Sequence, residues 1–350
     1  MSLMDHNVFT EPTRTEDGVW CFMGLEVEVI LASMFKGGAP LFTIRMRYPR
    51  IIHGEVMTHR VFNRNARSSR AVPVMTMLAE LRSGTLAGLF TPWHWGKNQS
   101  GMQASEENNT AVTMGDVRFN PGTQQLEFCE GDHTREEAWS MAAWNACEEA
   151  EAFHNAGYHK QVVNRLIEPF SYIDVLVTAT DWANFLHLRD HADAEPHLRD
   201  LARLIKLAMD DADVRVLEPG QWHLPYITGD DIDHAMDISD SRDIFNEWLC
   251  KISSARCARI SYKPFDGNAS YDKELERYEM LVGNGAVHAT PLEHQATPDT
   301  KSWQETVRIE GNVTTALKAG NDWDNPHLHG NLRGWIQNRK LVPNECVYDA

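Results

Sequence analysis

The stretch THRVFNRNARSSRAVP (residues 58–73) carries one histidine, four arginines and two adjacent serines, and no acidic residue. Arginine forks and serine hydroxyls bind phosphate oxygens in a fixed geometry, and arginine is preferred for that task. A solvated charged loop is the other interpretation of such a stretch. The absence of interleaved acidic residues favours the phosphate site.

The rest of the composition limits what this local site serves. The chain has 350 residues, with 33 Lys+Arg against 50 Asp+Glu and a formal net charge of -17. Nucleic acid and anionic membranes both attract broad positive surfaces, so we expect neither as a partner. An anion must therefore bind at a local basic site, and a small-molecule partner is expected.

The cysteines and the first residues predict a compartment. The six cysteines are scattered without a CxxC pair, which is typical of reduced thiols in a cytosol-like environment. The segment MSLMDHNVFTEPTRTEDG does not have the pattern of a secretory signal, and no apolar run reaches membrane-spanning length. We expect a cytoplasmic protein.

Periodic patterns predict the elements that position the basic stretch. Residues 25–31 and 41–48 alternate between apolar and polar side chains, which predicts two strands of a hairpin directly before it. Thr134 and Glu137 form a capping box at the start of a helix that ends near Gly157. Residues 173–189 are also predicted to be helical.

The remaining segments complete the expected fold class. Pro196 opens a further helix, residues 84–132 are predicted to be long loops, and residues 255–262 include an expected strand that carries Cys257 as a core residue. A turn-rich acidic stretch at 211–245 is the expected domain junction. Helical and strand segments intersperse without strict alternation, so we expect an α+β fold.

The basic stretch resembles the signature of the flavin-dependent thymidylate synthases, which runs Arg-His-Arg, a spacer, Asn-Glu, one residue, Ser, one residue, Arg. The matching positions are His59, Arg60, Asn65, Ser68 and Arg70, and the departures are Thr58, Ala66 and Ala71. The resemblance implies that His59, Arg60 and Asn65 contact a flavin. It implies that the segment Ser68, Ser69 and Arg70 holds the phosphate of dUMP.

Two later segments also resemble the family. NRLIEP (164–169) and NFLHLR (184–189) are similar to its Arg-x-x-x-Pro and Asn-Phe-x-x-Leu-Arg motifs. The resemblance implies that Arg165 and Arg189 bind the nucleotide and that Asn184 contacts the flavin.

Motifs near the end of the chain stand in an unusual order. ARISY (258–262) and VHATPLEH (287–294) resemble family motifs that normally precede the basic signature, and GWIQNRKLVPNE (334–345) resembles part of that signature itself. The flavin contacts implied by these three segments are Ser261, His288, Thr290, Glu293, Arg339, Asn344 and Glu345. Glu345 would restore the glutamate that is missing at Ala66.

Either a circular permutation or a fused, partly degenerate duplication explains this order. The second signature-like segment favours duplication. The resemblance therefore implies a thymidylate synthase-like α+β fold, with residues 1–215 as a nucleotide-binding half and residues 216–350 as a flavin-binding half.

The family methylates dUMP reductively to dTMP, taking a methylene group from methylenetetrahydrofolate and hydride through FAD that NADPH reduces. Carbon 5 of uracil must become nucleophilic, and a cation near the pyrimidine oxygens stabilises the charge that develops. Arg189 is the candidate for this catalytic role. Family members are homotetramers with shared sites, so we expect a homo-oligomer, either a dimer or a tetramer.

The departures at Thr58, Ala66 and Ala71 leave two alternatives open. A related enzyme would stop at a hydroxymethyl product, from either dUMP or dCMP. A non-catalytic relative would bind nucleotide or flavin without turnover.

His187 and His191 have a spacing that can hold a metal, but we interpret them as structural residues and predict no metal site. The aromatic segments WHW (93–95) and GQWHLPY (220–226) are interpreted as ordinary buried aromatics rather than stacking surfaces for a folate or a base.

Overall fold

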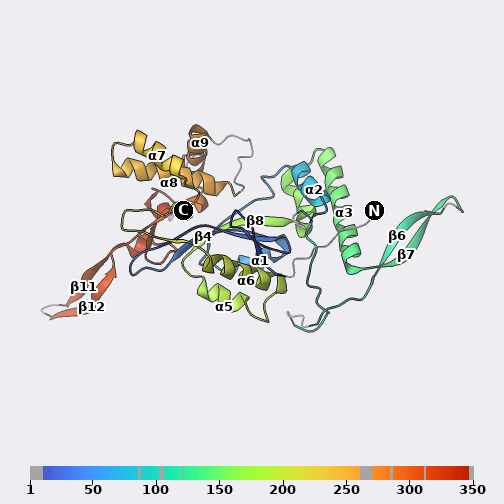
Figure 1. Cartoon of the computed structure of the whole chain (residues 1–350), viewed down its shortest axis with the longest axis horizontal. Coiled ribbons are helices and arrows are strands. Elements are labelled where there is room, and N and C mark those ends of the chain that lie inside the picture. The colour runs from blue at the N-terminus through green and yellow to red at the C-terminus, as the bar shows by residue number, and fades with distance from the viewer. Residues whose placement is uncertain are drawn as a thin grey trace.

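A seven-stranded sheet forms the centre of the protein (Figure 1). The structure is a computed structural model and describes residues 11–85, 88–101, 106–120, 122–260, 270–283, 287–310 and 313–346. In spatial order the strands are β1 (Thr13–Arg14), β2 (Trp20–Phe22), β3 (Leu25–Met34), β4 (Leu41–Pro49), β8 (Tyr172–Ala179) and β5 (Asn63–Ala66), and β9 (Val214–Val216) pairs in parallel with β3.

The predicted hairpin is confirmed, because β3 and β4 pair antiparallel with Ser33 opposite Leu41. The alternation of their sequences accounts for this pairing, since successive side chains of a strand point to opposite faces. Ile44 and Met46 of β4 are buried in the main core. The chain leaves β4 through a 3₁₀ turn, η1 (Arg50–Ile52), and the short helix α1 (His53–Val56), and so enters the basic stretch at the edge of the sheet.

The prediction of a helix over residues 173–189 was wrong in its first half. Residues 172–179 form β8, which lies between β4 and β5 and is buried at every position. A strand buried on both faces has no polar alternation, so its pattern does not differ from that of a buried helix. The helical part is α5 (Ala183–Arg189).

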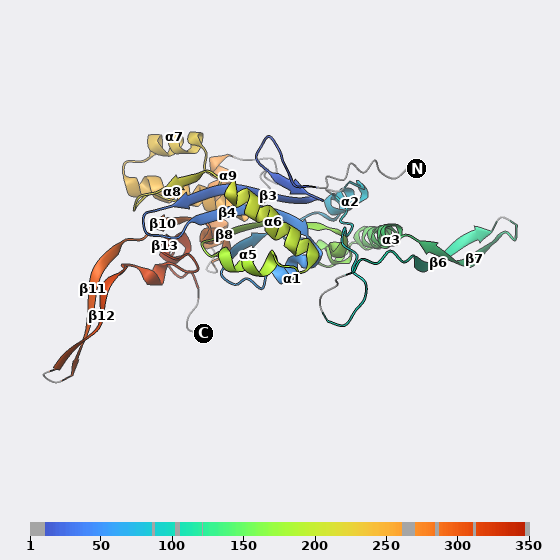
Figure 2. The ribbon, with the colours of Figure 1, turned by 60° about the horizontal axis from the view of Figure 1, so that its bottom comes forward.

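Helix α6 (Pro196–Asp210) covers one face of the sheet (Figure 2). Its predicted apolar stripe is confirmed, because all four stripe residues are fully buried: Leu198, Leu201, Ala202 and Ile205. They join Val175 and Val177 of β8 in the main core. The first half of the chain thus buries one face of its sheet with its own helix.

The opposite face is covered by helix α8 (Arg242–Ala258). Leu176 of β8 contacts Cys257. Cys257 is fully buried and lies in the helix rather than on the predicted strand. The rest of that predicted strand, residues 261–262, lies outside the described residues. Helices α7 (Gly229–Ile238) and α9 (Tyr271–Val282) pack beside α8. The sheet is antiparallel apart from the β3–β9 pair, and helices and strands are interspersed without strict alternation, which supports the α+β class.

A second core holds α2 (Val74–Arg82), α3 (Arg135–Asn155) and α4 (Lys160–Val163) together. The predicted capping box at Thr134 and Glu137 is confirmed at the start of α3. The prediction of loops throughout 84–132 was wrong, because β6 (Val112–Asn120) and β7 (Gln125–His133) form an antiparallel ribbon. Apolar and polar residues do alternate over residues 117–120 and 125–128, so the pattern offered a signal for these two strands that the prediction overlooked.

The last part of the chain adds small sheets to this body. β10 (Ala296–Pro298) pairs with β13 (Trp335–Gln337), and β11 (Lys301–Glu310) pairs with β12 (Val313–Trp323). The β6–β7 and β11–β12 ribbons project at opposite ends of the molecule (Figures 1 and 2). The division of the chain into a nucleotide-binding and a flavin-binding half between residues 215 and 216 stays a prediction. The strands of the large sheet all lie before residue 217.

Candidate functional site

Strand β5 positions the basic stretch between two parts of the chain. It pairs with β8, from Asn63 opposite Thr178 to Ala66 opposite Val175, and its other side packs against the 3₁₀ turn η4 (Thr290–Glu293). The residues of the stretch therefore divide into a group before β5, a group on it and a group after it.

Before β5, Arg189 meets the start of the basic stretch. From the end of α5 its Nε donates to His59 Nε2 at 2.9 Å, and its Nη2 donates to Thr58 Oγ1 at 3.1 Å. Burial, and next the charges of Arg189 and Arg64, lower the pKa of His59. His59 is therefore a neutral acceptor at pH 7, and it orients a guanidinium that keeps further donors for a ligand.

On β5, two side chains connect the stretch with the last part of the chain. Asn65 Nδ2 donates to the carbonyl of Cys257 at 2.6 Å. Asn331 Nδ2 donates to the carbonyl of Arg60 at 3.3 Å and to Asn63 Oδ1 at 3.2 Å. These contacts bring residues from both predicted halves of the chain to one edge of the sheet.

Next to β5, the residues around Glu293 form an ion-pair cluster. Arg339 pairs with Glu293, and its Nε donates to Glu345 Oε2 at 2.5 Å; Lys340 Nζ donates to Glu345 Oε1 at 2.6 Å. Burial raises the pKa of Glu293 and outweighs the opposing effect of Arg339. The charge of Glu293 also acts on Arg64, although burial is the largest influence on that arginine and lowers its pKa.

After β5, the carboxylate of Glu168 attracts the predicted phosphate ligands. Ser69 Oγ donates to Glu168 Oε1 at 2.5 Å, and Arg165 Nη1 reaches both of its oxygens at 3.0 and 3.2 Å. Arg50 Nη1 also donates to Glu168 Oε1, at 3.3 Å. Buried Asn164 fixes the turn by donating to the Ser69 carbonyl at 2.7 Å. Glu168 thus engages Ser69 and Arg165, which the resemblance assigns to the phosphate of dUMP. It also engages Arg50, which the resemblance does not assign.

The other arginines of the basic stretch differ in whether their side chains have a partner within the protein. Arg67 pairs with Glu80 at 2.8 Å and lies 3.7 Å from Asp174. Arg60 and Arg70 are exposed, and their side chains have no ion-pair or hydrogen-bond partner within the described part of the chain. Ser68 is exposed beside Arg70, and its Oγ accepts from the Arg70 backbone N–H at 3.3 Å. Arg60, Ser68 and Arg70 are therefore available to a ligand.

The structure does not bring all predicted residues together. β5 is about 10 Å long, at about 3.3 Å per residue, and it separates the Arg189 group from the Ser68 and Arg70 group. The predicted residues that lie exposed around these groups are Asn184, His288, Thr290 and Asn344. Ser261 lies outside the described residues.

Sequence reasoning missed Glu168, Asn164 and Arg50. Glu168 and Asn164 lie within the quoted segment NRLIEP, so an acid next to Arg165 was visible as a signal. Arg50 shared no motif with them, and only the fold shows that η1 lies beside η3 (Glu168–Phe170).

A buried polar chain runs through the sheet to the residue after Glu293. Ser33 Oγ is hydrogen-bonded to His223 Nδ1 at 2.8 Å, and His223 Nε2 to Thr43 Oγ1 at 2.8 Å. Thr43 is bonded to Thr178 at 2.6 Å, and Thr178 to His294 Nδ1 at 2.8 Å. Burial lowers the pKa of both histidines to about 3, so the chain is neutral at pH 7.

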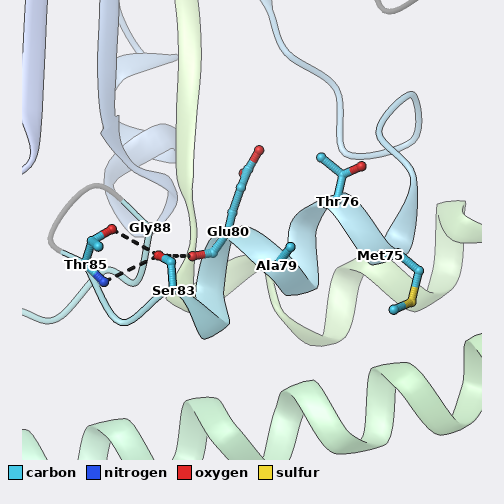
Figure 3. A pocket seen from close by; sticks show the side chains of 7 residues that line it. All are labelled: Met75, Thr76, Ala79, Glu80, Ser83, Thr85 and Gly88. Atoms are coloured by element: carbon cyan, nitrogen blue, oxygen red, sulfur yellow. Dashed lines mark hydrogen bonds between the residues drawn. The ribbon is translucent and has the colours of Figure 1, made fainter.

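A surface hollow lies along α2 (Figure 3). It has a volume of about 670 Å³, and its lining residues are Met75, Thr76, Ala79, Glu80, Ser83, Thr85 and Gly88. Ser83 Oγ donates to the Glu80 carbonyl at 2.7 Å. None of the predicted nucleotide or flavin ligands lines this hollow, so we do not assign it to them.

The described part of the chain contains no group of three or more His, Cys, Asp or Glu side chains that would hold a metal ion. No described helix combines the length and apolar character that a membrane crossing requires. Comparison with known protein families gives no matching family model, and comparison with curated proteins gives no matching sequence.

Proposed function

We propose that this protein is a flavin-dependent thymidylate synthase-like enzyme that converts dUMP to dTMP. The observation that carries the proposal is the meeting of separate motif segments at β5. Four parts of the chain meet here: the basic stretch that contains β5, Arg189, Cys257 in the helix that leads into ARISY, and Glu293 with Arg339 and Glu345. Their order in the chain gives no reason for this meeting, whereas a shared site for nucleotide and flavin does.

Arg189 is assigned to the pyrimidine. A guanidinium held by neutral His59 and by Thr58 can stabilise negative charge on a pyrimidine oxygen without moving during the reaction. The neutral state of His59 matters, because a protonated imidazole would repel Arg189 and lose its acceptor nitrogen.

The exposed groups around β5 fit a flavin with its phosphates. Arg60 is an unpartnered cation in the described part of the chain, and His288, Thr290 and Asn344 add exposed polar side chains. Bound FAD, reduced by NADPH, would supply the hydride, and methylenetetrahydrofolate would supply the carbon. The side chains of Asn65, Glu293, Arg339 and Glu345 would fix the position of that site through the contacts described above.

Phosphate binding is assigned to Ser68, Arg70 and Arg165. Arg165 is 57% exposed, so its side chain can leave Glu168 for a phosphate at little cost in free energy. A homo-oligomer with shared sites, as a dimer or a tetramer, is part of the proposal because members of the family that the motifs resemble share their sites between subunits.

One observation favours a second candidate, a relative that binds flavin or nucleotide without turnover. Glu168 already engages Ser69, Arg50 and Arg165, and a carboxylate at this position repels a phosphate. The hydroxymethylase alternative, on dUMP or dCMP, uses the same ligands and differs only in the product.

Binding measurements test the ligand assignments that these candidates share, and turnover then separates the candidates. The full chain is titrated calorimetrically with dUMP and with FAD, and then the variants Arg70→Gln and Arg189→Gln are titrated. We expect Arg70→Gln to weaken dUMP at least tenfold and to leave FAD unchanged. Arg203→Gln, on the exposed side of α6, is the control. If dUMP binds equally to the protein and to Arg70→Gln, the phosphate assignment is wrong.

A further inference from the structure

Two adjoining cavities lie on the far edge of the sheet, away from β5. They have volumes of about 170 and 220 Å³ and lie where β3 and β9 meet the residues before and within α7 and α8. Four residues line both: Leu31, Arg215, Leu224 and Ile227. Together the two volumes fall in the range of about 300–1,000 Å³ that small-molecule sites occupy.

The lining combines apolar walls with two positive charges. Trp222, Phe245 and Leu249 belong to the first cavity, with Arg215 and Arg242. Within the described residues, the Arg215 side chain has no ion-pair or hydrogen-bond partner, and Arg242 donates only to the Gly220 carbonyl, at 3.5 Å. In a protein of net charge -17, two arginines without acidic partners at one cavity are a local exception.

The acidic group that lines the second cavity does not neutralise them. Glu28 accepts from Arg45 Nε at 2.8 Å and is therefore already paired. The charge left at the cavities is positive, and it favours an anionic ligand.

The wall formed by residues 221–228 is held in an unusual backbone conformation. Tyr226 has a φ of 63°, which a bulky side chain rarely adopts. Ser253 Oγ donates to the Pro225 carbonyl at 2.8 Å, and Arg256 Nη1 donates to the Tyr226 carbonyl at 2.6 Å. Strained backbone held by surrounding contacts is typical of ligand clamps. In the same segment Trp222 and Leu224 line the cavities, while His223 between them is bonded inside the sheet.

We propose that these cavities bind a small aromatic anion, a planar ring that carries one phosphate or carboxylate group. The ring packs among Leu31, Trp222 and Phe245, and the acidic group meets Arg215 and Arg242. This is a second ligand site, separate from the groups around β5. Ser33, which lines the first cavity, is the first member of the polar chain that ends at His294, so the second site and η4 are joined through bonded side chains.

Calorimetric titration of the full chain tests the proposal with three probes: phenyl phosphate, 4-aminobenzoate and inorganic phosphate. We expect one or both of the aromatic probes to bind with one site per chain at this location and inorganic phosphate to bind far more weakly. Binding of phenyl phosphate alone identifies an aromatic phosphate as the ligand class, and binding of 4-aminobenzoate alone identifies an aromatic carboxylate. The double variant Arg215→Gln, Arg242→Gln should weaken the bound probe at least tenfold.

Both arginines are exposed, so their loss should leave the fold intact, which the unfolding midpoint verifies. Arg203→Gln is the matched control. Arg70→Gln separates this site from the proposed dUMP site, because it should leave the bound probe unaffected. Binding that is lost in Arg70→Gln and kept in the double variant would overturn the proposal. So would the absence of binding by both aromatic probes at millimolar concentration.

Discussion

The ion pair of Asp231 and Arg256 makes the stability of this protein depend on pH in a predictable way. Asp231 is 2% exposed and accepts from Arg256 at 2.6 and 2.8 Å and from the backbone and side chain of Thr228 at 2.7 and 2.8 Å. Burial alone would raise its pKa, but the bonds from Arg256 and Thr228 outweigh it and lower the pKa from 3.8 to about 2.

The shift fixes both the size and the sign of the effect. A pKa lowered by this amount corresponds to about 2–3 kcal/mol of folding free energy. Since the folded-state pKa lies below the unfolded value, this stability is fully present above about pH 4. It is lost as the pH falls from about 4 towards 2, where the folded protein also takes up the proton.

The variant Asp231→Asn tests this reasoning through urea unfolding at a series of pH values. Asparagine keeps the shape but cannot accept at both of its polar atoms, so we expect a loss of about 2–4 kcal/mol at pH 7. The difference from the unaltered protein should shrink as the pH falls below about 4. Asp233→Asn, on the exposed side of the same helix, is the control and should change little. A loss at Asp231 that is the same at pH 7 and at pH 3 would refute the reasoning.

Three further predictions follow from single contacts. Thr178→Val removes a hydroxyl bonded to Thr43 and His294 inside the sheet and should cost about 2–4 kcal/mol in urea unfolding; a cost below about 1 kcal/mol would contradict the polar chain. Thr134→Ala removes the cap of α3 and should cost about 1 kcal/mol, seen as a lower thermal midpoint, and an unchanged midpoint would count against the cap. Glu168→Gln removes the competing carboxylate and should raise the calorimetric affinity for dUMP several-fold, whereas weaker binding would show that Glu168 supports the site.

Local signals in the sequence predicted those elements that one face or one end of a segment determines. The β3–β4 hairpin follows from alternation, the start of α3 from its capping box, and α6 from an amphipathic stripe. β8 was misjudged as a helix because both of its faces are covered, by α6 on one side and α8 on the other. Which elements cover a strand depends on contacts distant in sequence, and no local pattern contains that information.

The candidate site shows the same limit. The basic stretch was visible as a cluster of cations, but its acidic partners lie elsewhere in the chain: Glu80 and Asp174 for Arg67, and Glu168 for Ser69. Short-range spacing predicts which residues can bind an anion. It does not predict which of them the protein's own carboxylates already engage, because that is decided when the fold brings the segments together.

The most direct test of the proposed function is mass analysis of the nucleotide after incubation of the protein with dUMP, methylenetetrahydrofolate, FAD and NADPH, with dCMP in a parallel reaction. We expect that dUMP gains a methyl group and that Arg189→Ala abolishes the gain, while Arg203→Ala does not. A hydroxymethyl gain, or reaction of dCMP alone, would keep the binding site and change the product. Unchanged nucleotides from protein that binds no flavin would contradict the enzymatic assignment.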